Sequence, residues 1–126
     1  MWMLNSRPRI MAKWAQGRVL DIGFADAPNP YLAGEVWGFD RCRDVWPDNY
    51  TYLVQGLCEN LCFAADAFDT IVAGQIIEHL MAPYQFLADC HRILKPKGRL
   101  VLSTTNPYFP PVVVLNWFLI PRFFWV

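Results

Sequence analysis

Short apolar runs alternate with turn residues along most of the chain. Five runs are expected as strands: Arg18–Gly23, Glu35–Asp40, Tyr52–Gln55, Asp69–Ala73 and Arg99–Thr104. Within the first, Val19, Leu20 and Ile22 form a nearly continuous apolar run, which is typical of a strand covered on both faces. The alternation of such strands with turn and helix signals predicts an α/β domain.

One segment has a clear helical period. Pro83 suits the first turn of a helix. The apolar residues that follow share one stripe, as expected for a helix packed on a sheet: Phe86, Leu87, Cys90, Ile93 and Leu94. Lys95-Pro-Lys-Gly98 is expected to end this helix.

The beginning of the chain gives weaker helix signals. Residues 9–16 predict a short leading helix that Gly17 closes. After the first strand, Pro28 and Pro30 oppose the regular helix that normally follows in a nucleotide-binding sheet. A loop is expected there, with about one turn near Tyr31.

Composition narrows the class of protein. The 126 residues suffice for one small domain, and 55% hydrophobic against 17% charged residues favours a buried core. The 11 basic and 11 acidic residues balance, so no direct signal for nucleic-acid binding is present. The four cysteines form no C-x-x-C pair, so no metal site is predicted and reduced thiols in a cytoplasmic protein are expected. Residues 1–10 lack the apolar stretch of a signal peptide.

Two acidic residues stand at the ends of the first two expected strands. Asp21-Ile-Gly23 ends the first, and Asp40 follows Asp21 by 19 positions at the end of the second. An acidic residue at about this spacing accepts hydrogen bonds from ribose hydroxyls in nucleotide-binding sheets. The alternative at this point is a pair of solvated aspartates at strand ends.

The second half of the chain carries more specific motifs. Asn60-Leu-Cys-Phe-Ala-Ala-Asp-Ala-Phe-Asp-Thr-Ile-Val precedes Glu78-His-Leu80, and Arg92-Ile-Leu-Lys-Pro-Lys-Gly98 follows. From about Val19 to Asn106, the chain resembles the methyltransferase type 11 group of class I S-adenosylmethionine-dependent methyltransferases. The resemblance implies a Rossmann-like three-layer sandwich with a mainly parallel sheet of order 3-2-1-4-5. The usual last strands of the family would be lacking, since the chain is short at its C-terminus.

The same resemblance implies where S-adenosylmethionine lies. It would cross the carboxyl ends of the first, second and fourth strands, in agreement with the general rule for open α/β sheets. The implied cofactor-binding residues are Asp21 at the methionine amino group, the loop residues Gly23, Phe24 and Ala25, Asp40 at the ribose and its neighbour Arg41, Leu57 and Cys58 beside the adenine, and Gly74 and Gln75 at the methionine end.

The chain also departs from the family pattern. Ala25 and Ala27 replace two of the three loop glycines, and Leu57 stands where the family usually has aspartate. His79 is a candidate general base, although a packing or structural role is the favoured interpretation. Gln75 and the turn at 106–108 are weaker candidates for the pocket of the methyl acceptor.

The last part of the chain is strongly apolar. We expect a nucleotide-binding domain over residues 1–106 and an apolar tail over 107–126. The tail is too short and too rich in proline to span a bilayer. It could cover the core, form an oligomer interface or contact a membrane surface. A free edge on the fifth strand, together with the tail's large aromatic residues, predicts a homodimer; those residues are Trp117, Phe118, Phe123, Phe124 and Trp125.

Two function classes remain open. Asp21, Gly23 and Asp40 favour an S-adenosylmethionine-dependent methyltransferase that acts on an unidentified acceptor. The altered glycine loop, Leu57 and the short C-terminus favour a binding or interaction module on a degenerate methyltransferase fold. The enzyme is the preferred hypothesis.

Overall fold

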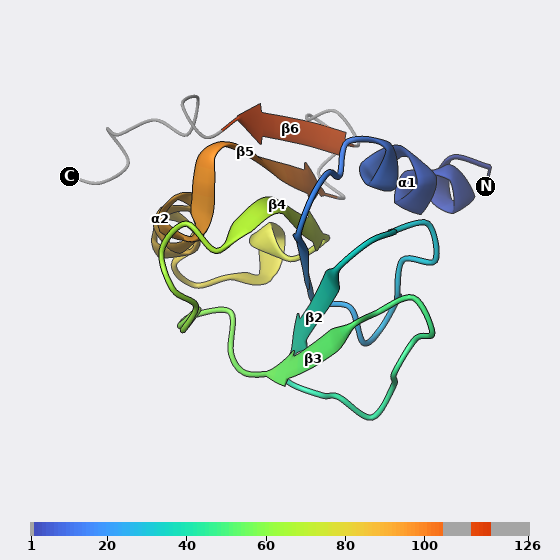
Figure 1. Ribbon diagram of the computed structural model, residues 1–126, viewed down its shortest axis with the longest axis horizontal. Coiled ribbons are helices and arrows are strands. Elements are labelled where there is room, and N and C mark those ends of the chain that lie inside the picture. The colour runs from blue at the N-terminus through green and yellow to red at the C-terminus, as the bar shows by residue number, and fades with distance from the viewer. Residues whose placement is uncertain (1, 105–111, 117–126) are drawn as a thin grey trace.

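A computed structural model describes residues 2–104 and 112–116 of the chain. In chain order the elements are α1 (Trp2–Lys13), β1 (Val19–Ile22), β2 (Val36–Asp40), β3 (Tyr52–Gln55), β4 (Phe68–Gly74), the short 3₁₀ helix η1 (Ile77–His79), α2 (Pro83–Ile93), β5 (Leu94–Ser103) and β6 (Val112–Asn116). They build one sheet of order β3-β2-β1-β4-β5-β6 (Figure 1). The strands from β3 to β5 are parallel, which confirms the predicted order 3-2-1-4-5.

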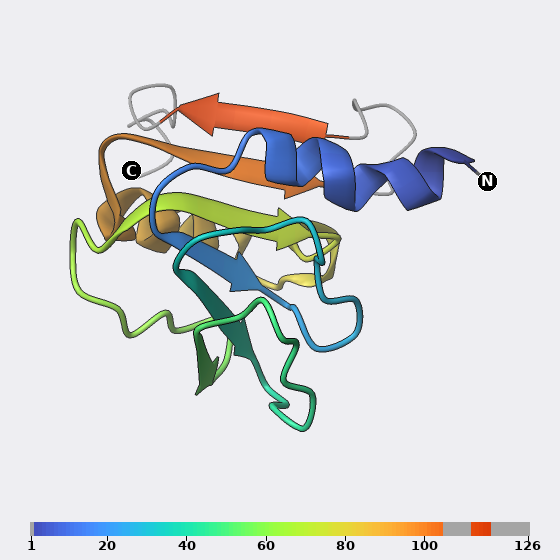
Figure 2. The same cartoon turned by 45° about the vertical axis from the view of Figure 1, so that its right-hand side comes forward.

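The sheet separates two layers of core residues. Alternate side chains of a strand point to opposite faces, so Leu20 and Ile22 pack with the buried stripe of α2. Val19, Val72 and Val101 instead pack with Met11 of α1. Figure 2 shows α1 and α2 on opposite sides of the sheet. The predicted three-layer arrangement is therefore present.

The connection between β1 and β2 contains turns but no helix, as the two prolines predicted. Without a crossover helix, the face of β1 and β2 needs other apolar cover. Phe24, Leu32 and Tyr50 provide it, and each is nearly inaccessible to solvent. These side chains tie the connecting loops to the strands.

Several element boundaries differ from the predictions. The leading helix lies earlier than residues 9–16, because hydrogen bonds from Trp14 to Met11 and from Ala15 to Ala12 end it in a tight turn. β5 begins at Leu94 and not at Arg99, because Leu94 already pairs with Phe68. A register shift before Arg99 and a positive φ of 71° at Lys97 mark an irregular region where the sequence predicted a turn.

The predicted free edge of the fifth strand is wrong. β6 pairs antiparallel with β5, and its register matches Leu100 to Leu115 and Leu102 to Val113. Part of the predicted apolar tail therefore adds a strand to the sheet and covers this edge; residues 105–111 and 117–126 lie outside the described part. Neither of the two α-helices described here has the length and apolar character needed to cross a bilayer.

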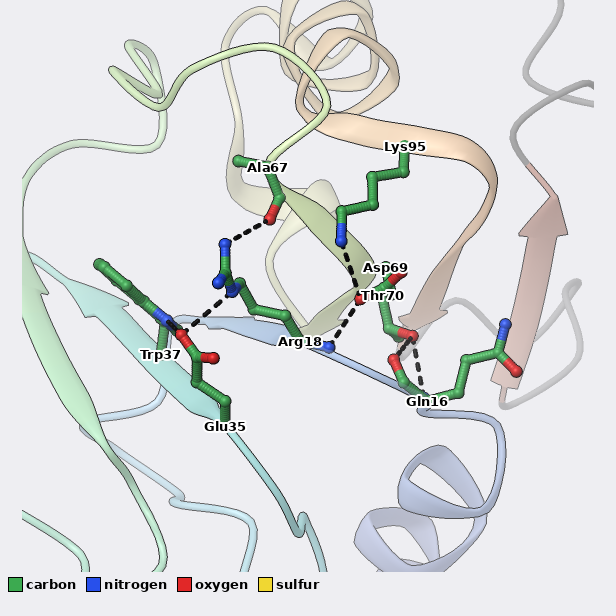
Figure 3. Close-up of polar contacts among 8 residues, drawn as sticks. All are labelled: Gln16, Arg18, Glu35, Trp37, Ala67, Asp69, Thr70 and Lys95. Atoms are coloured by element: carbon green, nitrogen blue, oxygen red, sulfur yellow. Dashed lines mark hydrogen bonds and ion pairs between the residues drawn. The ribbon is translucent and has the colours of Figure 1, made fainter.

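Polar side chains connect the amino-terminal ends of the strands (Figure 3). These ends lie opposite the carboxyl-terminal ends of the parallel strands, which we call the strand tips. Asp69 accepts a hydrogen bond from the Arg18 backbone N–H at 2.8 Å and pairs with Lys95 at 3.4 Å. Arg18 in turn pairs with Glu35 at 3.0 Å. These contacts are partly exposed, so we assign them to strand alignment and expect a small stabilising effect from each ion pair.

Candidate functional site

A cavity of about 580 Å³ opens where the parallel strands end. Its walls come from the tips of β1, β2, β4 and β5, together with η1 and one face of α1. The sequence-predicted residues that line it are Asp21, Gly23, Asp40, Arg41, Cys58, Gly74, Gln75 and the candidate base His79. The fold thus brings most of the predicted site residues together at one place.

The remaining predicted residues lie outside the cavity lining. The Phe24 ring is fully buried in the core and packs against Tyr50 with 5.4 Å between ring centroids. Ala25 contributes its backbone N–H, which donates to Asp40. The Leu57 side chain is 56% exposed, and its neighbour Cys58 lines the cavity instead.

Asp40 ends β2 with its carboxylate held by backbone groups. Oδ2 accepts a hydrogen bond from the Ala25 N–H and Oδ1 accepts one from the Cys42 N–H, both at 3.1 Å. A carboxylate has about four acceptor positions, so these two bonds orient it and leave capacity for ligand hydroxyls. Asp40 is only partly buried.

Asp21 lies deeper, with 5% of its surface exposed. The Tyr50 hydroxyl donates a hydrogen bond to Asp21 Oδ2. Burial raises the pKa of the Asp21 carboxyl to about 7; the Tyr50 hydrogen bond opposes this rise and the nearby Asp40 charge adds to it. The site therefore contains a carboxyl that changes charge close to neutral pH.

Two backbone positions at the carboxyl ends of the strands have an unusual conformation. Gly23 has a φ of +79° and its N–H donates to the Phe39 carbonyl at 2.7 Å. An added Cβ there would lie 2.4 Å from Ile76 Cδ1, another cavity residue. Gln75 also has a positive φ, of 56°, which is uncommon for a residue other than glycine. Strained positions of this kind are concentrated at functional sites.

Residues that the sequence did not single out also line the cavity. They include Ser103 at the tip of β5, Asn29 on the β1–β2 connection, and Arg7 on α1. Ser103 Oγ and Arg7 Nε are buried and have no hydrogen-bond partner among the described residues. The position of Ser103 at a strand end was a usable signal. The position of α1 beside the strand tips was not predictable, because no periodic pattern in the sequence indicates it.

Two further lining residues carry chemically versatile side chains. His79 is exposed on η1. Cys58 is partly buried, and burial raises the pKa of its thiol to about 11. Because only the thiolate is a good nucleophile, Cys58 is expected to remain an unreactive wall residue.

Comparison with known proteins agrees with this architecture. A family model described as "Methyltransferase domain" matches residues 20–102, more than half of the chain. The chain is 38% identical over 102 residues to ubiquinone biosynthesis O-methyltransferase of Cereibacter sphaeroides, covering 71% of this chain and 41% of that protein. It is 38% identical over 80 residues to the mitochondrial enzyme of the same name from Rattus norvegicus, covering 64% and 22%.

A solved structure shows the same fold. The S-adenosylmethionine-dependent methyltransferase of Mesorhizobium loti superposes with a TM-score of 0.61 at 23% identity, covering 77% of this chain and 51% of that one. The chain spans less than half the length of the two curated relatives. The matched residues and the strand order lead to one conclusion: the chain belongs to the methyltransferase domain family, whose class I members use S-adenosylmethionine, and has the class I fold.

Proposed function

We propose that this chain binds S-adenosylmethionine in the cavity at the strand tips and serves in methyl transfer. The observation that carries the proposal is the convergence of Asp21, Gly23 and Asp40 on one cavity. Ligands of open α/β sheets bind at this edge, outside the carboxyl ends of the strands.

The residues present fit such a cofactor. The Asp40 carboxylate is already oriented by two backbone N–H groups and has acceptor capacity for ribose hydroxyls. Asp21 supplies a buried carboxyl of the kind that pairs with an ammonium group. Ser103 Oγ and Arg7 Nε are polar atoms without a described partner, and a buried polar atom of this kind normally has one. A polar ligand in the cavity would supply it.

When bound, S-adenosylmethionine supplies an electrophilic methyl group on a sulfonium. The chain's own contribution is orientation. Asp40 would hold the sugar, Asp21 would hold the amino acid end, and the Gly23 loop would allow close approach. Positioning the acceptor in line with the methyl group supplies a large part of the acceleration in such transfers, so the lack of an identified base does not count against methyl transfer, and His79 is proposed as a wall residue. A hydroxyl acceptor would release its proton as the oxygen–methyl bond forms and the sulfur–methyl bond breaks.

An oxygen acceptor is the first class to test. Both curated relatives are named as O-methyltransferases. The acceptor itself stays unidentified, since specificity in such folds depends on variable loops.

Asp40→Ala is expected to weaken S-adenosylmethionine binding by about 1.5–3 kcal/mol, the range for hydrogen bonds to a charged group. Titration calorimetry on the variant and the wild type measures this. Asp44→Ala is the matched control, because Asp44 is an exposed carboxylate just beyond Asp40 and is not part of the cavity lining. Equal affinity in all three proteins would remove Asp40 from the site.

A second candidate is a cofactor-binding module without catalysis. Ala25 and Ala27 in the glycine loop, and the exposure of Leu57 outside the cavity, favour it. Binding of S-adenosylmethionine without methyl transfer to any hydroxylated acceptor tried would support this candidate.

The homodimer and the cytoplasmic location stay predictions. The dimer argument loses the free β5 edge, because β6 covers it. Its remaining support is the aromatic residues of 117–126, which lie outside the described residues. Light scattering at low micromolar concentration tests the dimer, and a monomer mass unchanged on dilution would exclude it under those conditions.

A further inference from the structure

Tyr50 stands just before β3, far along the chain from the residues it contacts. Its side chain is buried, with its ring against Phe24. Gly38 leaves the space for this ring, since an added Cβ would lie 2.9 Å from Tyr50 Cδ2. The ring is therefore held in one place, and this fixes where the hydroxyl points.

The hydroxyl uses both its donor and an acceptor position. It donates to Asp21 Oδ2 and accepts from the Asn29 N–H at 2.9 Å. The Asn29 side chain is buried and donates to the Pro8 carbonyl of α1 at 3.0 Å. One tyrosine thus joins the carboxylate of β1 to the β1–β2 connection and, through Asn29, to the helix on the other side of the cavity.

Building on the proposed function, we propose that Tyr50 is the positioning residue of the cofactor site, fixing the Asp21 carboxylate for the cationic end of S-adenosylmethionine. In this chain side-chain hydrogen bonds fix the carboxylate, because the β1–β2 connection has no helix. Asn49 strengthens the same arrangement by donating to the carbonyls of Asn29 and Leu32 at 2.9 and 3.0 Å.

The arrangement also tunes charge. Asp21 is buried and close to the Asp40 charge, and both features disfavour its ionised form. The Tyr50 hydrogen bond acts in the opposite direction, lowering the pKa of Asp21. The other ionisable side chains that line the cavity are Arg7 on α1, Asp26 on the β1–β2 connection, Arg41 just after β2, Cys58 and Glu59 beyond β3, and His79 on η1.

The test is the pH profile of S-adenosylmethionine binding, measured by calorimetry between pH 5.5 and 8.5. Tyr50→Phe keeps the ring and removes the hydroxyl. We expect its affinity at pH 7 to fall about tenfold, because Asp21 loses the contact that orients it and a smaller fraction of it is ionised. We also expect the midpoint of its pH profile to rise by about one pH unit. Titration of the ligand's amino group affects all proteins equally, so the difference between profiles reports on the protein.

Tyr52→Phe is the matched control. Tyr52 is 48% exposed, packs on Trp37 and is not part of the cavity lining. Its profile should coincide with that of the wild type.

If Tyr50→Phe fails to fold, a second modified protein tests the inference. Replacing Tyr50 with 3-fluorotyrosine keeps the ring and makes the hydroxyl a stronger donor, so the midpoint should move to lower pH. If the wild type binds and Tyr50→Phe shows the same pH profile, the inference is overturned and the proposed function stands. A midpoint that the fluorinated residue does not move would have the same meaning. No binding by the wild type would refute the proposed function, and the inference with it.

Discussion

Asp21→Asn is expected to stabilise the ligand-free protein at pH 8 while removing its affinity for S-adenosylmethionine. The folded-state pKa of Asp21 is raised by burial from an ordinary 3.8 to about 7. Between these values the folded protein keeps a proton that the unfolded chain has released. The stabilising contribution of this proton is therefore complete below about pH 4 and is lost as the pH rises through 7.

Asparagine does not titrate and keeps a carbonyl oxygen for the Tyr50 hydroxyl. The variant should therefore match the wild type near pH 4. At pH 8 its free energy of unfolding should exceed that of the wild type by on the order of 2–4 kcal/mol. Urea denaturation at pH 4.5, 6 and 8 measures the difference, with Asp44→Asn as the control for loss of an exposed carboxylate. Parallel pH curves for wild type and Asp21→Asn would show that Asp21 is not the titrating group.

The cost of the buried carboxyl has a functional interpretation. Replacing a charge by a neutral isostere removes the partner for a ligand ammonium, so binding should fall even as stability rises. This trade is typical of sites where a strained or desolvated group serves the ligand.

Gly23→Ala is expected to destabilise the fold and to disturb the wall of the cavity. The positive φ at this position costs an alanine about 1–2 kcal/mol. The new Cβ would also stand 2.4 Å from Ile76 Cδ1. The Ile76 side chain must therefore move. Because it is part of the cavity wall, we expect S-adenosylmethionine affinity to fall about tenfold or more. Thermal unfolding and calorimetry measure the two effects separately.

Gly34→Ala separates strain from displacement. Gly34 has a similar φ of +81°, but the nearest atom to an added Cβ is the Gly17 carbonyl oxygen at 3.9 Å. This variant should lose a comparable amount of stability and keep the wild-type affinity. An equal loss of affinity in both variants would mean that the Gly23 effect comes from general loosening of the loop.

The parallel strands were predictable from the chain because each is a short apolar run that ends in a recognisable turn, and their order followed from the resemblance to the methyltransferase family. The stripe of α2 was equally clear, since its buried residues recur at helical spacing. β6 was not predictable as a partner of β5. It follows Pro110 and Pro111 in a strongly apolar segment, and its residues 112–115 show no alternation of apolar and polar positions that would indicate a strand.

The site was predictable where it depends on strand ends and unpredictable where it depends on distant contacts. Asp21 and Asp40 stand at positions that the fold rule places at one edge. Tyr50 reaches Asp21 across 29 positions of sequence, and its role follows from the space above Gly38. Arg7 enters the cavity only because α1 packs against β5 and β6. Neither fact leaves a local pattern.

An amide chemical-shift titration of the wild-type chain with S-adenosylmethionine tests the cofactor site most directly. Saturable shifts are expected at the strand tips, including the amides of Gly23, Asp40 and Gly74, which belong to residues of the cavity lining. The amides of Arg18 and Asp69, at the opposite end of the sheet, should stay in place. Saturable shifts centred on that opposite end, or none at millimolar ligand, would contradict the proposal that this cavity is the cofactor site.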